Sequence, residues 1–203
     1  MTSIYDLKPR FQNLLRPVCR RLAAVGISAN AVTLAALLLS LAHGAWIASR
    51  PHSRVPLLCL PITLFIRMAL NAIDGMLARE HGMKSRLGAL LNEVGDVVSD
   101  AALYLPLALV PGLSASLIVV AVALGIIGEM TGALGPTVGA SRRYDGPMGK
   151  SDRAAVFGLL AVLIGGGLPA GLWSTIFVSA VVALAGATIF NRARGALAEG
   201  REA

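Results

Sequence analysis

Carboxylates in the middle of the chain stand between two long apolar runs, and this placement restricts the fold more than any other feature. The apolar runs cover residues 55–70 and 101–110, and the stretch between them, 71–100, contains Asp74 and Asp96 among its acidic residues. A charged side chain inside such a run is expensive to bury in a bilayer, and it usually marks a functional site. The pattern therefore indicates membrane helices that carry a polar site.

Helical periodicity places the polar side chains of this stretch on two faces. Asn71 and Asp74 stand three residues apart and Arg67 stands four before Asn71, so these three share one helix face. The second face is formed by residues spaced four apart, Asn92, Asp96 and Asp100. Glu93 lies beside this face. Helices joined by a short loop are expected to be antiparallel neighbours, so the two faces can meet. Their oxygen ligands suit Mg²⁺, Mn²⁺ or Ca²⁺ better than zinc.

The composition supports a membrane protein over a soluble one. Of the 203 residues, 56% are hydrophobic and 14% are charged, and the mean hydropathy is +0.72. Charged residues precede any long apolar run, which does not fit a cleavable signal peptide. The net charge of +7 is better explained by basic loops facing anionic lipid than by nucleic acid, so no nucleic-acid partner is expected. Cys19 and Cys59 are expected to form no disulfide and to bind no metal.

Six apolar segments predict an all-α, polytopic membrane helical bundle that forms a single domain over residues 1–203. The expected transmembrane helices cover residues 29–49, 55–79, 88–110, 113–135, 154–168 and 171–190. The fifth segment is short for a hydrocarbon core that needs ~20 residues, so it is expected to extend through Ser151 or to be tilted.

The N-terminal segment, residues 1–27, precedes these spans. Apolar side chains are interspersed with lysine and arginine over residues 4–25, which favours an amphipathic interfacial helix over an ordinary basic tail. Gly26 is expected to end that helix, and Ser28 can cap the next one.

The distribution of basic residues predicts the orientation. Fifteen of the 18 lysines and arginines lie before the first span, in the 79–87 and 136–153 loops, or in the tail, whereas only Arg50 and Arg54 lie on the other side. This bias predicts a multi-pass protein of the plasma membrane, or of the inner membrane in a bacterium, with both termini and the polar site facing the cytoplasm.

Residues 71–96 resemble the signature of the CDP-alcohol phosphatidyltransferases, Asp-x2-Asp-Gly-x2-Ala-Arg-x8-Gly-x3-Asp-x3-Asp. Six positions match it with the internal spacing intact: Asp74, Gly75, Ala78, Arg79, Gly88 and Asp96. Asn71 and Asn92 stand where the pattern has its first and third aspartates. The hydrophobic layout of nearly the whole chain also fits the family.

The resemblance implies transfer of a phosphatidyl group from a CDP-linked lipid, such as CDP-diacylglycerol, to the hydroxyl of an alcohol acceptor, with release of CMP in phospholipid biosynthesis. It implies two divalent ions, Mg²⁺ or Mn²⁺, which would neutralise the substrate pyrophosphate. It also implies a homodimer among membrane lipids, and glycine-rich faces such as Gly125, Gly128 and Gly132 would permit helix packing. The acceptor alcohol is not predicted.

The resemblance also assigns roles to residues. Asp96 is implied to be the base that deprotonates the acceptor hydroxyl. The candidate metal ligands are Asn71, Asp74, Asn92, Asp96, Asp100 and Glu93. The candidate contacts to the nucleotide or its phosphates are Gly75, Ala78, Arg79, Gly88, Arg67 and Lys150. Gly88 is also expected to let the third span cross the second closely.

Some of these residues have simpler interpretations. Asp100 could instead be a structural partner of Arg67 or Ser99, and for Glu93 a polar contact to a neighbouring helix is slightly favoured. Arg67 could pair with Glu129, and Arg79 could interact with the helix dipole. A basic cluster could bind a phosphate-bearing acceptor or form an ordinary cytoplasmic loop: Arg142, Arg143, Lys150 and Arg153.

Two other functions compete with the enzyme. A membrane transporter would also place carboxylates in spans, but it predicts inverted halves or broken helices, and the sequence shows neither. A non-catalytic or diverged relative would bind lipid or nucleotide without turnover, although Asp74 and Asp96 argue against complete loss of the site.

Overall fold

The computed structural model describes residues 4–200, with side chains from residue 11 onward. Every regular element in this part of the chain is helical, which confirms the all-α class. The α-helices are α1 (Ile4–Ala24), α2 (Ala29–Ser49), α3 (Arg54–Glu80), α4 (Arg86–Tyr104), α5 (Ala115–Ala133), α6 (Lys150–Gly165) and α7 (Leu172–Glu199), and two short 3₁₀ helices are η1 (Leu105–Leu109) and η2 (Gly135–Val138).

The helix boundaries follow the local signals in the sequence. Gly26, two residues after the last residue of α1, adopts a φ of +79°, as expected for a glycine that ends a helix. Ser28 caps α2, because its Oγ accepts a hydrogen bond from the Ala31 backbone N–H at 3.2 Å. The fifth predicted segment does extend through Ser151, since α6 begins at Lys150.

The prediction of six transmembrane helices is not confirmed by helix length and composition. Within residues 4–200, four helices are long and apolar enough to cross a membrane: α2, α3, α5 and α7. The segment predicted at 88–110 forms the 19-residue α4, which carries three acidic residues and ends at Tyr104, where η1 follows. The segment predicted at 154–168 forms α6, which has 16 residues, below the ~20 that a hydrocarbon core needs.

The helices belong to two compact units, with the chain passing between them inside α2, α3 and α4. The first unit comprises Met1–Ala42 and Ile62–Ser99, and the second comprises His43–Pro61 and Asp100–Ala203.

In the first unit, α1 packs against α2 and α3. The buried core is formed by Cys19, Ala29, Val32, Ile73, Met76 and Leu77. Cys19 is a free thiol, as is Cys59, which confirms that neither forms a disulfide within the described residues. Burial raises the pKa of the Cys19 thiol, because the thiolate would be poorly solvated there. Arg16 of α1 and Glu80 at the end of α3 form an exposed ion pair at 2.9 Å.

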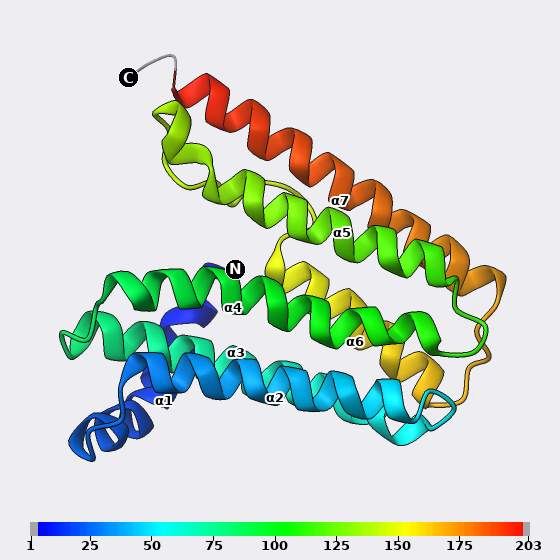
Figure 1. The fold of residues 1–203 in the computed structure, drawn as a ribbon, viewed down its shortest axis with the longest axis horizontal. Coiled ribbons are helices and arrows are strands. Elements are labelled where there is room, and N and C mark those ends of the chain that lie inside the picture. Colours follow the sequence, from blue (N-terminus) through cyan, green and yellow to red (C-terminus); the bar gives the residue numbers. More distant parts are fainter. Residues whose placement is uncertain (1–3, 201–203) are drawn as a thin grey trace. The chain divides into compact units, whose positions relative to one another are not determined.

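In the second unit, α5 and α7 lie side by side (Figure 1). The glycines of α5 face inward in this unit: a Cβ on Gly125 would lie 3.2 Å from Arg153 Cδ, and one on Gly128 would lie 3.7 Å from Ile189 Cγ1. The glycine-rich face therefore packs within the chain, where small residues allow helices to approach closely. Tyr104 and Phe157 stack with ring centroids 4.4 Å apart.

Candidate active site

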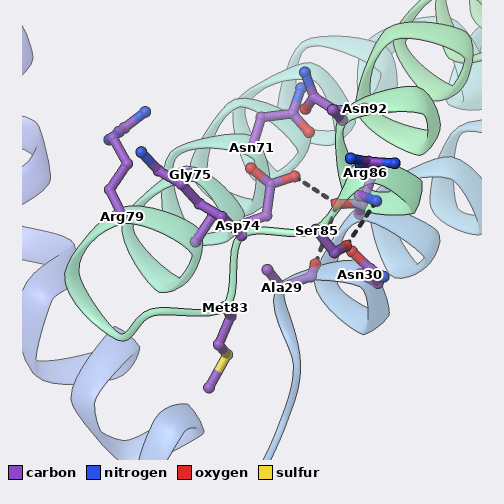
Figure 2. Close-up of a pocket in the computed structure, with 15 residues that line it drawn as sticks. Ala29, Asn30, Asn71, Asp74, Gly75, Arg79, Met83, Ser85, Arg86 and Asn92 are labelled. Carbon is purple, nitrogen blue, oxygen red and sulfur yellow. Dashed lines mark hydrogen bonds between the residues drawn. The ribbon is translucent and has the colours of Figure 1, made fainter.

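A cavity of about 800 Å³ opens in the first unit, between the start of α2, the end of α3 and the start of α4 (Figure 2). Seven residues that the sequence singled out line it: Asn71, Asp74, Gly75, Ala78, Arg79, Gly88 and Asn92. Asn71 and Asp74 come from α3, whereas Asn92 comes from α4. Two helices that are joined by a short loop therefore present their polar faces to one space, as their spacing predicted.

Asp74 is the buried carboxylate of the cavity, with 5% of its surface exposed. Its Oδ2 accepts a hydrogen bond from the Thr33 hydroxyl at 2.9 Å. Thr33 lies on α2 and is itself buried, so a third helix fixes the orientation of this carboxylate. A charge-assisted bond of this kind is stronger than one between neutral groups.

Asp96 lies on α4 next to the cavity and connects to it through Asn71. The amide Nδ2 of Asn71 donates to Oδ1 of Asp96 at 3.0 Å. Arg67, which is 3% exposed, places Nη2 3.4 Å from the same oxygen and donates to the Asp96 backbone carbonyl at 3.1 Å. The predicted contact between the face of Arg67 and Asn71 and the face of Asp96 is thus present.

Two glycines leave room that a side chain would fill. A Cβ on Gly75 would lie 3.2 Å from Nη2 of Arg79, so the guanidinium of Arg79 folds back over this glycine. A Cβ on Gly88 would lie 2.6 Å from Oδ1 of Asn30 and 2.9 Å from Oγ of Ser85. The close approach at Gly88 is therefore to Asn30 of α2. The sequence had predicted a close approach to the second span, which is α3, so this part of the prediction is wrong.

Sequence reasoning missed the contribution of α2 and of the loop before α4. The additional lining residues are Ala29, Asn30, Thr33, Met83, Lys84, Ser85, Arg86 and Ala89. A signal was present, because Asn30 and Thr33 stand three residues apart at the start of an otherwise apolar run and so share a helix face. Ser85 also caps the entry to α4, since its Oγ accepts the Gly88 N–H at 2.9 Å.

Comparison with known proteins shows the family to which this chain belongs. A family model described as CDP-alcohol phosphatidyltransferase matches residues 26–190. The chain belongs to the CDP-alcohol phosphatidyltransferase family. The matched region includes all the residues that line the cavity.

Two relatives of this family member differ in how much of the chain they cover. Inner membrane protein YnbA of Escherichia coli (strain K12) is 48% identical over 200 residues, which is 96% of each chain. Archaetidylinositol phosphate synthase of Pyrococcus horikoshii is 30% identical over 103 residues, which is 51% of this chain and 52% of that protein.

Solved structures show the same fold at low sequence identity. Phosphatidylinositol phosphate synthase (PgsA1) of Mycobacterium tuberculosis with CDP-DAG bound has a TM-score of 0.74 and 19% identity, and the match covers 89% of this chain and 92% of that one. The same protein in complex with manganese and citrate also gives a TM-score of 0.74, and the match covers 89% and 87% of the two chains.

The donor set of this CDP-alcohol phosphatidyltransferase fits a hard divalent cation. Asp74 and Asp96 offer carboxylate oxygens, and Asn71 and Asn92 can offer amide oxygens, all of which suit Mg²⁺ or Mn²⁺. Carboxylates are few, however: within residues 4–200, no group of three or more His, Cys, Asp or Glu side chains is placed to hold a metal ion.

Besides Asp96 and Arg67, three further candidate residues do not line the cavity: Glu93, Asp100 and Lys150. Glu93 is half-buried on α4 and is absent from the lining. Asp100 and Lys150 belong to the second unit. Asp100 is 6% exposed and accepts hydrogen bonds from Nη2 and Nε of Arg153 at 2.8 and 3.1 Å. Arg153 is therefore a partner of Asp100. The interpretations drawn from the sequence named Arg67 or Ser99 as its partner, and not Arg153.

The basic cluster of the second unit forms a network with carboxylates. Glu129 meets three arginines, with distances of 3.1 Å to Arg153, 3.3 Å to Arg192 and 3.7 Å to Arg142. Arg192, which is 2% exposed, also donates to the Gly128 carbonyl at 2.7 Å.

The outer part of this network joins the α5–α6 connection to α7. Arg143 pairs with Asp145 at 2.7 Å and with Glu199 of α7. The hydrogen bond from Arg143 lowers the pKa of Asp145, because it stabilises the ionised carboxylate. Arg142, Arg143 and Arg153 of the predicted basic cluster are thus engaged with carboxylates of the same chain.

Proposed function

We propose that this protein transfers a substituted phosphate group from a CDP-linked lipid of the CDP-diacylglycerol type to an alcohol, and releases CMP. The observation that carries the proposal is the cavity in the first unit, where five of the six residues that match the family signature converge and Asp96 lies next to them. Family membership and the CDP-DAG complex of the Mycobacterium tuberculosis relative support it.

The carboxylates and amides of the site are the proposed metal ligands in this reaction. A divalent ion, when bound, would neutralise the pyrophosphate and the leaving CMP. Asp74 and Asp96 would hold it as charged ligands, with Asn71 and Asn92 as neutral ones. Thr33 fixes one of the two carboxylates through its 2.9 Å bond to Asp74.

Asp96 is the proposed general base. It would take the proton of the acceptor hydroxyl as the hydroxyl oxygen attacks the phosphorus. Asn71 and the buried Arg67 orient its carboxylate through contacts of 3.0 and 3.4 Å. The space left at Gly75 lets Arg79 fold over the helix, where its guanidinium would contact the nucleotide phosphates.

The proposed membrane arrangement has all six helices α2–α7 in the bilayer, with both termini and the cavity on the cytoplasmic side. The fifteen-to-two charge bias supports this orientation. A reporter fused after Ala203 should be cytoplasmic and one inserted near His52 should be external. A cytoplasmic signal at His52 would overturn the arrangement.

We further propose that the protein is a homodimer, as the family resemblance implies. The mass of the protein in detergent, corrected for bound detergent, should be that of two chains. A single-chain mass at all protein concentrations would exclude it.

The reaction is tested by CMP release from purified protein given CDP-diacylglycerol, Mg²⁺ or Mn²⁺, and a mixed pool of alcohols. CMP release that stops on chelation of divalent ions and with Asp74→Asn would support the proposal. Full activity after exhaustive chelation would contradict the metal-dependent mechanism. Binding of the CDP-lipid without CMP release under all conditions would instead favour a non-catalytic relative.

A further inference from the structure

We infer that the substrate-free site holds one divalent cation, with Asp74 and Asp96 as its charged ligands, and that the amide of Asn71 takes over the role of a second cation beside Asp96. The inference deepens the proposed function and rests on it for the location of the site. It concerns the two asparagines, Asn71 and Asn92, which line the cavity at positions where the signature has aspartates.

The first argument is charge. Four carboxylates, as in the signature, carry enough negative charge to compensate two divalent ions, whereas Asp74 and Asp96 alone compensate one. Arg67 adds a positive charge next to Asp96 and is only 3% exposed. With one divalent ion, this group would have a net charge of one positive; with two, it would have three positive charges. Uncompensated charge is costly at a buried site, so the second ion is disfavoured.

The second argument is the hydrogen bond between Asn71 and Asp96. Two carboxylates in contact repel one another unless a cation or a proton lies between them. Here the amide Nδ2 of Asn71 donates to Oδ1 of Asp96 at 3.0 Å, so the contact between the two helices is attractive without any ion. Asn71 therefore holds the proposed base in place and removes the need for an ion at this contact.

The third argument is the rest of the cavity. Among the residues that line the cavity, Asp74 is the one carboxylate. Its Oδ2 already accepts a hydrogen bond from Thr33 at 2.9 Å. Among residues 4–200, no cluster of three potential His, Cys, Asp or Glu ligands exists that would supply the missing charge. Asn92 can add an amide oxygen to a bound ion but cannot offset its charge.

The inference is tested by counting Mn²⁺ ions on substrate-free protein in detergent, by equilibrium dialysis and elemental analysis. One tightly bound ion per chain is expected for the natural sequence, and two for the double variant Asn71→Asp/Asn92→Asp. In the double variant the electron paramagnetic resonance spectrum of Mn²⁺ should show coupling between two ions. Glu80→Gln, at an exposed carboxylate outside the cavity, is the matched control and should leave the count at one.

A second measurement keeps the inference testable if the double variant does not fold. Removal of divalent ions should lower the melting temperature of Asn71→Asp more than that of the natural protein, because two carboxylates would then face one another without a cation. Equal shifts in the two proteins would overturn the role given to Asn71.

The outcomes separate this inference from the proposed function. Two ions on the natural protein would overturn the inference and leave the metal-dependent transferase intact. No bound ion, together with CMP release that survives chelation, would overturn both. One ion on the natural protein and still one on a folded double variant would overturn the charge argument.

Discussion

The two units of this protein use buried charge in opposite ways. In the first unit, Asp74 and Asp96 are held by a hydroxyl, an amide and one arginine, and Asp74 faces a cavity of about 800 Å³. In the second unit, Asp100 and Glu129 are held by arginines through distances of 2.8 to 3.7 Å. The first arrangement leaves room for a charged ligand, whereas the second satisfies its charges from within the chain.

The comparison shows that a carboxylate in a largely apolar helix does not by itself mark a site. Asp96 and Asp100 stand four residues apart on α4, and sequence spacing gave them the same candidate role. Their partners differ. Asp96 accepts a hydrogen bond from the amide of Asn71, which lines the cavity, whereas Asp100 accepts hydrogen bonds from Arg153, which is 4% exposed. The partner decides whether such a residue serves chemistry or stability, and this difference can be tested by substitution.

The largest expected effect is the loss of activity in Asp96→Asn. Asparagine keeps the size and one oxygen of the side chain but cannot accept the acceptor's proton at neutral pH. Turnover should fall at least ~100-fold, the lower end of what a general base contributes. The melting temperature should fall less than in Asp100→Asn, because the Arg67 contact to the Asp96 carboxylate is long, at 3.4 Å, and the bond from Arg67 to the Asp96 backbone carbonyl is kept. CMP release and thermal unfolding, measured on the same detergent preparation, check both parts.

Asp100→Asn should show the reverse pattern. Removal of one partner leaves the charge of Arg153 buried without its nearest carboxylate, which should destabilise the protein by ~3–5 kcal/mol. The fraction that remains folded should keep most of its turnover. If Asp100→Asn folds normally and is inactive while Asp96→Asn turns over, the base lies one helical turn further along α4 than proposed.

The double variant Asp100→Leu/Arg153→Met sharpens this prediction. It removes both charges and fills the space with apolar side chains, so it should be clearly more stable than Asp100→Asn alone. A double variant as unstable as the single one would show that the pair is needed for more than its own neutralisation.

A smaller effect is expected for Thr33→Val, which removes the hydrogen bond to Asp74 and keeps the shape of the side chain. A hydrogen bond to a charged group contributes ~1.5–3 kcal/mol, so Mn²⁺ affinity and turnover should fall by about tenfold or somewhat more. Thr33→Ser retains the hydroxyl and should retain most of both. Equal losses in the two variants would indicate a packing defect instead of a lost bond.

The smallest effect is expected at the ion pair of Arg16 and Glu80, where both side chains are more than a third exposed. Exposed pairs contribute little because water screens them. Glu80→Gln should therefore leave the melting temperature and CMP release unchanged within error. A clear loss of either would mean that α1 is held on the first unit mainly by this pair.

Much of the fold and about half of the site were predictable from the sequence. Helix class, the end of α1, the start of α6, and the meeting of Asn71 with Asp96 follow from local signals, helical periodicity and the short loop between α3 and α4. The contribution of Thr33 and the pair of Asp100 with Arg153 could not be predicted in this way. They join residues 41 and 53 positions apart, and such contacts depend on how each helix is rotated against its neighbours.

The charge network of the second unit also has a consequence for the order of synthesis. A chain is made from its N-terminus, so Asp100 on α4 and Glu129 on α5 leave the ribosome before Arg153 on α6 and Arg192 on α7. Until α7 has been made, Glu129 lacks an arginine that lies 3.3 Å away in the finished protein. Nascent chains that stop before α6 therefore carry Asp100 and Glu129 without Arg153 and Arg192, and they are expected to be less stable than the finished protein.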